Sequence, residues 1–270
     1  MIRTYFKFYT LSISLVICLC SFGQNQDSTI VNSIFIIPEV IIGKTLEANT
    51  DFPETSLQKN IFFSLGRYNF SRNKEWAARL NYPKTGISAG YIDFGNSEKI
   101  GRAYILMPFI EFSIFKKSVS GLNLHIGIGG SYMDTQYNIE TNALNKAITT
   151  KVNWSFRSFV YYDMFKSNTT DWRFGLGFLH HSNGHAKLPN QGLNSLAASL
   201  SAKIDTKTKP KIDTKPHNFK SKSQTYITTR FGFGQNVLSE TFNTKKEVYT
   251  FSMSAGKIIN NTFKFGGGFY

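Results

Sequence analysis

The sequence predicts an all-β protein, an antiparallel transmembrane β-barrel of the outer-membrane type with eight or more strands and ten to twelve expected. Two observations support this fold class. Segments of about ten residues recur in which an apolar face alternates with a face of Gly, Ser, Asn, Lys and Arg, the signature of a membrane-spanning barrel. Phe and Tyr are abundant, with 25 and 13 copies, and only 18% of residues are charged. Such a composition suits strands more than helices.

Eleven segments show this alternation, separated by turn-rich spacers. They cover residues 33–44, 60–68, 86–94, 104–115, 122–132, 151–165, 171–183, 195–204, 225–235, 248–256 and 262–270. A strand needs roughly 9–11 residues to cross a membrane, and most of these segments have that length. Pro38 predicts that the first segment is irregular or lies at an edge. A soluble barrel or sandwich is the alternative, with the apolar faces turned inward.

Eleven strands conflict with the even number found in bacterial single-chain barrels. A barrel of ten or twelve strands fits if one segment is misassigned or if the natural chain continues. The charged stretch 203–224 interrupts the pattern of alternation. It is of low complexity, since the five residues Lys203–Lys207 recur at 211–215. We therefore expect one barrel domain over residues 24–270 that contains a flexible, Lys-rich connection at 203–224.

Residues 1–23 have the pattern of a secretory signal peptide. Arg3 and Lys7 precede an apolar run at 11–20 that is too short to span a bilayer, and cleavage is expected near Gly23 and Gln24.

Both cysteines, Cys18 and Cys20, fall in this segment. The mature chain then has no disulfide, thiol nucleophile or cysteine metal site. Lipid attachment at Cys20 is the rival interpretation, although Leu19 is larger than the residue that usually precedes a lipidated cysteine.

The chain carries a formal charge of +14, from 31 Lys and Arg against 17 Asp and Glu. These cations form no single basic helix or stripe, so nucleic-acid binding is not expected. An anionic surface such as a phosphorylated glycolipid accounts for the charge, and so does a well-solvated exterior.

The segment 171–183 carries the candidate chemistry. Its apolar face comprises Trp, Phe, Leu and Phe at alternate positions, and His180 and Ser182 continue that face. Residues two apart in a strand lie roughly 6.5–7 Å from each other, so the imidazole can take the hydroxyl proton as Ser182 attacks an ester carbonyl. Asn183, Gly184 and the following backbone are candidates to stabilise the oxyanion. A His-x-Ser pair alone is weak evidence.

The full run from His180 to Asn194 resembles the active-site segment of the outer-membrane lipid A 3-O-deacylases, including related bacterial acyloxyacyl hydrolases. The matching elements are His-x-Ser-Asn at 180–183, then Lys187, Pro189-Asn190 and Gly192, without a gap. The resemblance implies an eight-stranded barrel that removes an ester-linked acyl chain from lipid A with a Ser-His-acid triad. It implies Ser182 as nucleophile, His180 as base, and Asn183 with the next amides as the oxyanion site.

One position departs from the family pattern, because the triad glutamate falls at Asn194. An amide can hold an imidazole in the required tautomer, but it stabilises imidazolium less well than a carboxylate does. Slower turnover or a different acid is expected, with Glu111 as a distant candidate. The alternative is that Asn194 only caps a turn and activity is lost.

We therefore expect an outer-membrane carboxylic-ester hydrolase that acts on lipopolysaccharide or lipid A in the outer leaflet. His185 and Lys187 are candidate substrate-binding residues. No metal and no cofactor are expected, because no histidine pair has the spacing of a metal site. Two alternatives remain: a non-catalytic barrel, acting as a pore or structural protein with a degenerate motif, and a soluble lipid-binding barrel.

Overall fold

The computed structural model describes residues 34–69, 75–115, 121–206, 223–260 and 263–270. Within these residues the chain is all-β, with eleven strands and the short helix α2 (Glu75–Arg79). None of the helices in the described ranges is long and apolar enough to cross a membrane. The expected signal peptide, its cleavage site and both cysteines lie outside the described residues.

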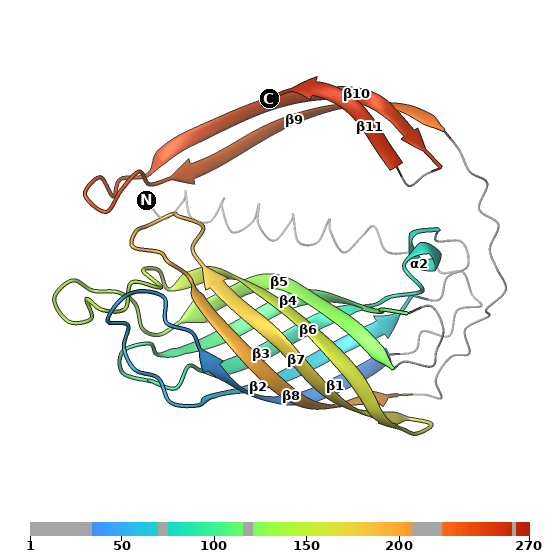
Figure 1. Ribbon diagram of the computed structural model, residues 1–270, viewed down its shortest axis with the longest axis horizontal. Helices are drawn as coiled ribbons and strands as arrows, with labels where there is room; N and C mark the ends of the chain where they lie inside the picture. The colour runs from blue at the N-terminus through green and yellow to red at the C-terminus, as the bar shows by residue number, and fades with distance from the viewer. Residues whose placement is uncertain (1–33, 70–74, 116–120, 207–222, 261–262) are drawn as a thin grey trace, which may run out of the picture. The chain divides into compact units, whose positions relative to one another are not determined.

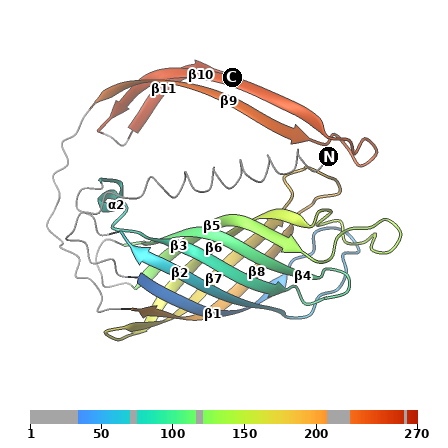
Figure 2. The ribbon, with the colours of Figure 1, turned by 180° about the vertical axis from the view of Figure 1, so that it is seen from behind.

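Eight consecutive strands close an antiparallel barrel in which each strand pairs with its neighbour in sequence and the first pairs with the eighth (Figures 1 and 2). The strands are β1 (Ile34–Thr45), β2 (Gln58–Tyr68), β3 (Lys84–Asp93), β4 (Arg102–Ser113), β5 (Leu122–Met133), β6 (Val152–Lys166), β7 (Thr170–Ser182) and β8 (Leu193–Asp205). The expected antiparallel barrel is confirmed, and it closes with eight strands.

The remaining strands form a separate sheet in the order β11-β10-β9. They are β9 (Gln224–Asn236), β10 (Lys246–Ile259) and β11 (Phe263–Phe269). All eleven expected strands are present, but the barrel has neither ten nor twelve strands and does not take up the whole of 24–270. Because β8 pairs with β1, neither of these two strands has a free edge to which β9 or β11 could pair.

Pro38 was expected to make its strand irregular or an edge strand, and the first alternative is confirmed. The ladder between β1 and β8 skips Ile37 and Pro38, and a closed barrel has no edge strand. One local expectation needs correction. The connection expected at 203–224 begins later, because β8 continues to Asp205. Lys203 is 4% exposed and its Nζ lies 2.9 Å from Oδ2 of Asp171 on β7.

Side chains on the outer surface of the barrel are apolar, and those inside are largely polar. Ile61, Leu106 and Leu176 are each more than half exposed, whereas the charged Arg157 and Arg173 are almost fully buried. A soluble barrel has the opposite arrangement. This polarity is that of a barrel whose outer face meets lipid, which excludes the soluble alternative.

Side chains fill the barrel interior. The Arg157 guanidinium lies 2.6 Å from Glu39 Oε2, and Arg173 lies 3.0 Å from Oε2 of Glu111, which also accepts from Lys84 at 2.6 Å through Oε1. Towards the end of β7 the interior becomes apolar. The apolar cluster includes Ile41, Phe62, Ile92, Phe94, Ile100, Ile105, Met107, Met133, Phe159, Leu179 and Leu193. The filled interior gives the end of β7 a rigid support.

The loops at the end of the barrel where β7 finishes cover residues 46–57, 94–101, 134–151 and 183–192. At the opposite end the connections cover 69–83, 114–121 and 167–169. The loop 134–151 braces the loop 183–192, because the backbone N–H groups of Gln191 and Gly192 donate to Lys146 O and Ala147 O at 3.1 Å each. The candidate site therefore sits beside the longest loop of the barrel.

Candidate functional site

Three neighbouring strands bring the candidate residues together on the outer surface. In the register of β7 and β8, His180 pairs with Asn194. In the register of β6 and β7, Trp154 pairs with Ser182 and Phe156 with His180. Asn194 is therefore the direct cross-strand neighbour of His180, although fourteen residues separate the two in sequence.

The His180 ring is held by one hydrogen bond and two aromatic side chains. Its Nδ1 lies 2.7 Å from Oδ1 of Asn194. An amide oxygen only accepts, so Nδ1 carries the proton and the lone pair is left on Nε2. The ring lies 4.9 Å from the Trp154 ring and 6.4 Å from the Phe178 ring, measured between centroids. This arrangement prepares Nε2 to accept a proton.

The hydroxyl oxygen of Ser182 accepts two hydrogen bonds. The backbone N–H of Gly184 donates at 3.1 Å, and the side-chain amide of Asn190 donates at 2.9 Å. Neither bond uses the hydroxyl hydrogen of Ser182. Across the described part of the chain, Ser182 and His180 share no hydrogen bond, so proton transfer needs a rotamer change or the approach of substrate.

The Asn183 side chain braces the loop. It donates to Lys187 O at 2.8 Å and accepts from the Ala186 N–H at 3.1 Å. Its contacts therefore lie within the loop, whereas Gly184 and Asn190 reach Ser182. Of the two residues expected around the oxyanion, the structure brings only Gly184 to the serine oxygen.

Gly184 and His185 both have left-handed backbone conformations, with φ of 65° and 63°. This turn directs the Gly184 N–H back to Ser182. A Cβ on Gly184 would meet nothing closer than 3.8 Å, so the backbone conformation, and not space, favours glycine there.

Asn190 is the residue to which the sequence assigned no role. Its side chain is 6% exposed, donates to Ser182, and accepts from the Asn183 N–H at 3.1 Å. The preceding residue, Pro189, is held by a hydrogen bond from Thr149 Oγ1 in the loop 134–151. The only signal in the sequence was the place of Asn190 in the Pro-Asn pair of the family-like run.

His185 and Lys187 lie exposed in the same loop. Their side chains make no hydrogen bond or ion pair with other described residues, and the Lys187 carbonyl is used by Asn183. Both side chains are therefore accessible to a ligand that approaches this loop.

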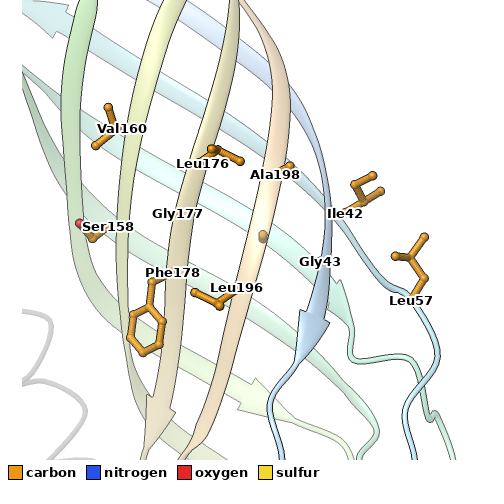
Figure 3. Close-up of a pocket in the computed structure, with 11 residues that line it drawn as sticks. Ile42, Gly43, Leu57, Ser158, Val160, Leu176, Gly177, Phe178, Leu196 and Ala198 are labelled. Carbon is orange, nitrogen blue, oxygen red and sulfur yellow. The ribbon is translucent and has the colours of Figure 1, made fainter.

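An apolar groove of about 690 Å³ runs over the outer surface of β6, β7, β8 and β1 (Figure 3). The lining residues are Ile42, Gly43, Leu57, Ser158, Val160, Leu176, Gly177, Phe178, Leu196, Ala197 and Ala198. Phe178 belongs to this lining and also stacks on His180. The groove therefore leads along the lipid-facing surface to the candidate base.

Other candidate residues lie inside the barrel. Glu111 is 1% exposed and is occupied by Lys84 and Arg173, so it is not placed to orient His180. The ring of His181 faces inward, with its Nδ1 at 2.8 Å from Ser155 Oγ. No group of three His, Cys, Asp or Glu side chains suited to a metal ion occurs in the ranges described above.

The chain is similar to known proteins over part of its length. A family model described as lipid A 3-O-deacylase (PagL) matches residues 62–203, which is more than half of the 270-residue chain. No curated protein matches the chain. Among solved structures, the crystal structure of Neisserial surface protein A matches with 10% sequence identity and a TM-score of 0.37, covering 63% of this chain and 96% of that one.

Proposed function

The chain belongs to the lipid A 3-O-deacylase (PagL) family, and from this premise we propose that it is an outer-membrane serine esterase. Its substrate is an ester-linked acyl chain of lipid A or a related lipid. The observation that carries the proposal is that His180 and Ser182 lie on the outward side of β7, with Ser182 8% exposed and the His180 ring oriented by Asn194 at 2.7 Å.

Ser182 acts as the nucleophile and His180 as general base and then general acid. Nε2 of His180 takes the hydroxyl proton while Ser182 Oγ bonds to the ester carbonyl carbon. The negative charge then moves to the carbonyl oxygen. When the tetrahedral intermediate collapses, the ester C–O bond breaks and His180 returns the proton to the leaving alkoxide. Water releases the acyl chain from Ser182 in a second round of the same steps.

Gly184 and Asn190 supply the oxyanion site in this mechanism. Their N–H groups already point at Ser182 Oγ, at 3.1 and 2.9 Å. When Oγ moves to bond with the ester carbonyl carbon, the carbonyl oxygen lies close to the position that Oγ has left. Both N–H groups can then donate to that oxygen. Donors held by the fold before reaction stabilise developing charge without reorganisation.

Asn194 is a positioning residue for His180. Its oxygen accepts the Nδ1 proton and so keeps Nε2 basic, the role that an amide fulfils in Cys-His-Asn proteases. It adds no negative charge beside the imidazolium, so the proposed activity is slower than that of a triad with a carboxylate.

The end of the barrel that carries the site is proposed to face the outside of the cell. Outer-membrane barrels have longer loops on the extracellular side. The longest connection, 134–151, lies at the site's end, and the shortest, 167–169, lies at the other. This orientation places Ser182 beside the outer leaflet, where lipopolysaccharide resides.

The groove and the exposed side chains of His185 and Lys187 support a lipid substrate. The groove is apolar, open to the lipid side and continuous with Phe178 beside His180, so it suits an acyl chain. His185 and Lys187 lie where phosphate groups of a glycolipid headgroup can be bound. The pore alternative has less support, because side chains fill the described barrel interior.

Asn190→Asp is expected to lower kcat by roughly 10²–10³-fold with little change in KM, because it removes one oxyanion donor. The aspartate keeps the oxygen that accepts the Asn183 N–H. Steady-state deacylation of lipid A measures the effect. Gln191→Glu, which adds the same charge at the neighbouring exposed position, is the matched control. A kcat for Asn190→Asp equal to that of the control would contradict the assignment.

Ala198→Trp is expected to fill the groove and raise KM for a long-chain ester by about tenfold, because an apolar chain loses roughly 1.4 kcal/mol of contact. A short water-soluble ester does not need the groove, so its hydrolysis is expected to be unchanged. Leu106→Trp on the outer face of β4 is the control for a bulky lipid-facing residue. Equal loss on both esters would show that the groove does not bind the chain.

A further inference from the structure

The separate sheet β9–β11 has one face that is rich in aromatic side chains, with Glu247 and Lys257 towards its two ends. Phe231 pairs with Phe251, and their rings lie 5.0 Å apart between centroids; Phe233 pairs with Tyr249 at 5.3 Å. The larger side chains of this aromatic face are Ile227, Phe231, Phe233, Tyr249, Phe251, Met253, Phe263, Phe265 and Phe269. The least exposed of these, Met253, is still 39% exposed.

The opposite face is polar or small. Arg230 pairs with Ser252, Thr228 with Ser254, and Gly232 with Thr250. Val248, Ile258 and Tyr226 are its larger apolar members. The sheet is therefore amphipathic, with the same alternation that distinguishes the lipid-facing and interior sides of the barrel strands.

Two features exclude a membrane-spanning position for this sheet by itself. The outer edges of β9 and β11 have no strand partner within the described residues, and unpaired backbone groups are not tolerated in hydrocarbon. The polar face, which includes Arg230, also has no lumen to enclose it, since three strands do not close. A position in the plane of the membrane interface avoids both difficulties, because water reaches the strand edges and the polar face there.

The chain itself keeps the sheet near a membrane. β8 runs away from the His180 site and ends at Asp205, and β9 begins at Gln224. The 18 intervening residues span at most about 60 Å when fully extended. The sheet is thus tethered to the end of the barrel opposite the site. Arg230, Lys246 and Lys264 lie on the polar face, whereas the aromatic face carries one charge of each sign, on Lys257 and Glu247.

We propose that the aromatic face of β9–β11 docks on the phospholipid surface at the barrel end opposite His180, with its rings at headgroup level. Phe side chains on the apolar face of an interfacial segment bury at the boundary between headgroups and acyl chains, and the hydroxyl of Tyr249 can remain near water. This docking surface is independent of the esterase assignment, since it uses only the membrane barrel and the connection of β8 to β9.

Single-cysteine labelling of the whole chain tests the proposal. Phe251→Cys on the aromatic face and Ser252→Cys on the polar face are made with Cys18 and Cys20 replaced by serine. Each is labelled with an environment-sensitive fluorophore, and the protein is reconstituted in phosphatidylcholine and phosphatidylglycerol vesicles. The label at 251 is expected to shift to the blue and to be quenched by a lipid spin-labelled near the headgroup, whereas the label at 252 is not.

The pair Phe231→Cys and Gly232→Cys repeats the comparison on β9, so that the result does not depend on the folding of one variant. Equal quenching of both faces would overturn the proposal, as would stronger quenching by a deeply placed spin label than by a shallow one. A label at 251 that is shielded from water yet not quenched by lipid would also overturn it, because a protein, such as a second copy of the chain, would then cover this face.

Discussion

Ser182→Ala is expected to reduce release of fatty acid from lipid A by roughly 10⁴-fold or more, because the nucleophile that forms the acyl intermediate is lost. The alanine is close in volume to serine, and the hydroxyl it removes only accepts hydrogen bonds in the structure, from Gly184 and Asn190. Binding of lipid A to the variant is therefore expected to persist.

The measurement is mass spectrometry of lipid A after incubation with purified protein in detergent micelles or vesicles. Ser64→Ala is a suitable control, because Ser64 is buried inside the barrel and shares its hydrogen bond with Ser88 at 2.7 Å. Release of fatty acid by Ser182→Ala at the rate of Ser64→Ala would rule out the catalytic mechanism. Heat-dependent gel mobility verifies that both variants form the barrel.

Asn194→Asp is expected to raise kcat by about 10- to 1,000-fold. A carboxylate of the same shape keeps the 2.7 Å contact with Nδ1 of His180 and adds a negative charge that stabilises the imidazolium formed during reaction. In a serine protease the reverse change, from Asp to Asn, costs about 10⁴-fold in kcat. The gain here is smaller because His180 is only half-buried and water screens the charge.

Asn194→Leu provides the opposite arm of this test, because it removes the acceptor and frees the imidazole to rotate and change tautomer. Its kcat is expected to fall below that of the unsubstituted chain. Asn138→Asp, in the loop 134–151, controls for a negative charge added at the same end of the barrel. A positioning role for Asn194 is supported if kcat falls in the order Asp, Asn, Leu at position 194. Equal kcat for all three would show that this residue only shapes the turn.

Much of the barrel could be predicted because side-chain alternation along a strand is a local property. Each of the eleven strands was found from period two alone, and the same alternation placed His180 and Ser182 on the lipid-facing side of β7. Trp172 and Phe174 on that face are exposed, and His181 of the opposite parity is buried inside. No knowledge of strand pairing was needed for these conclusions.

The number of strands in the barrel could not be predicted in the same way. The segments in β9–β11 have the alternation of barrel strands, and nothing in their own sequences shows that they pair apart. Closure depends on the pairing of β1 with β8, which joins residues such as Phe35 and Asp205. Such long-range pairing is decided by the whole set of strands and connections, not by the pattern in any one of them.

The sequence by itself therefore determined the fold class, the strand that carries the candidate site and the side of the barrel on which that strand presents it. Only the tertiary structure decided which side chains surround the candidate residues. Asn194 reaches His180 because the register of β7 and β8 makes them neighbours, and Asn190 reaches Ser182 because the loop 134–151 holds the loop 183–192 in place. Glu111 is excluded for the same reason, since its strand turns it into the interior beside Lys84 and Arg173. Alternation is a property of neighbouring residues, whereas these contacts exist only after the chain has closed on itself.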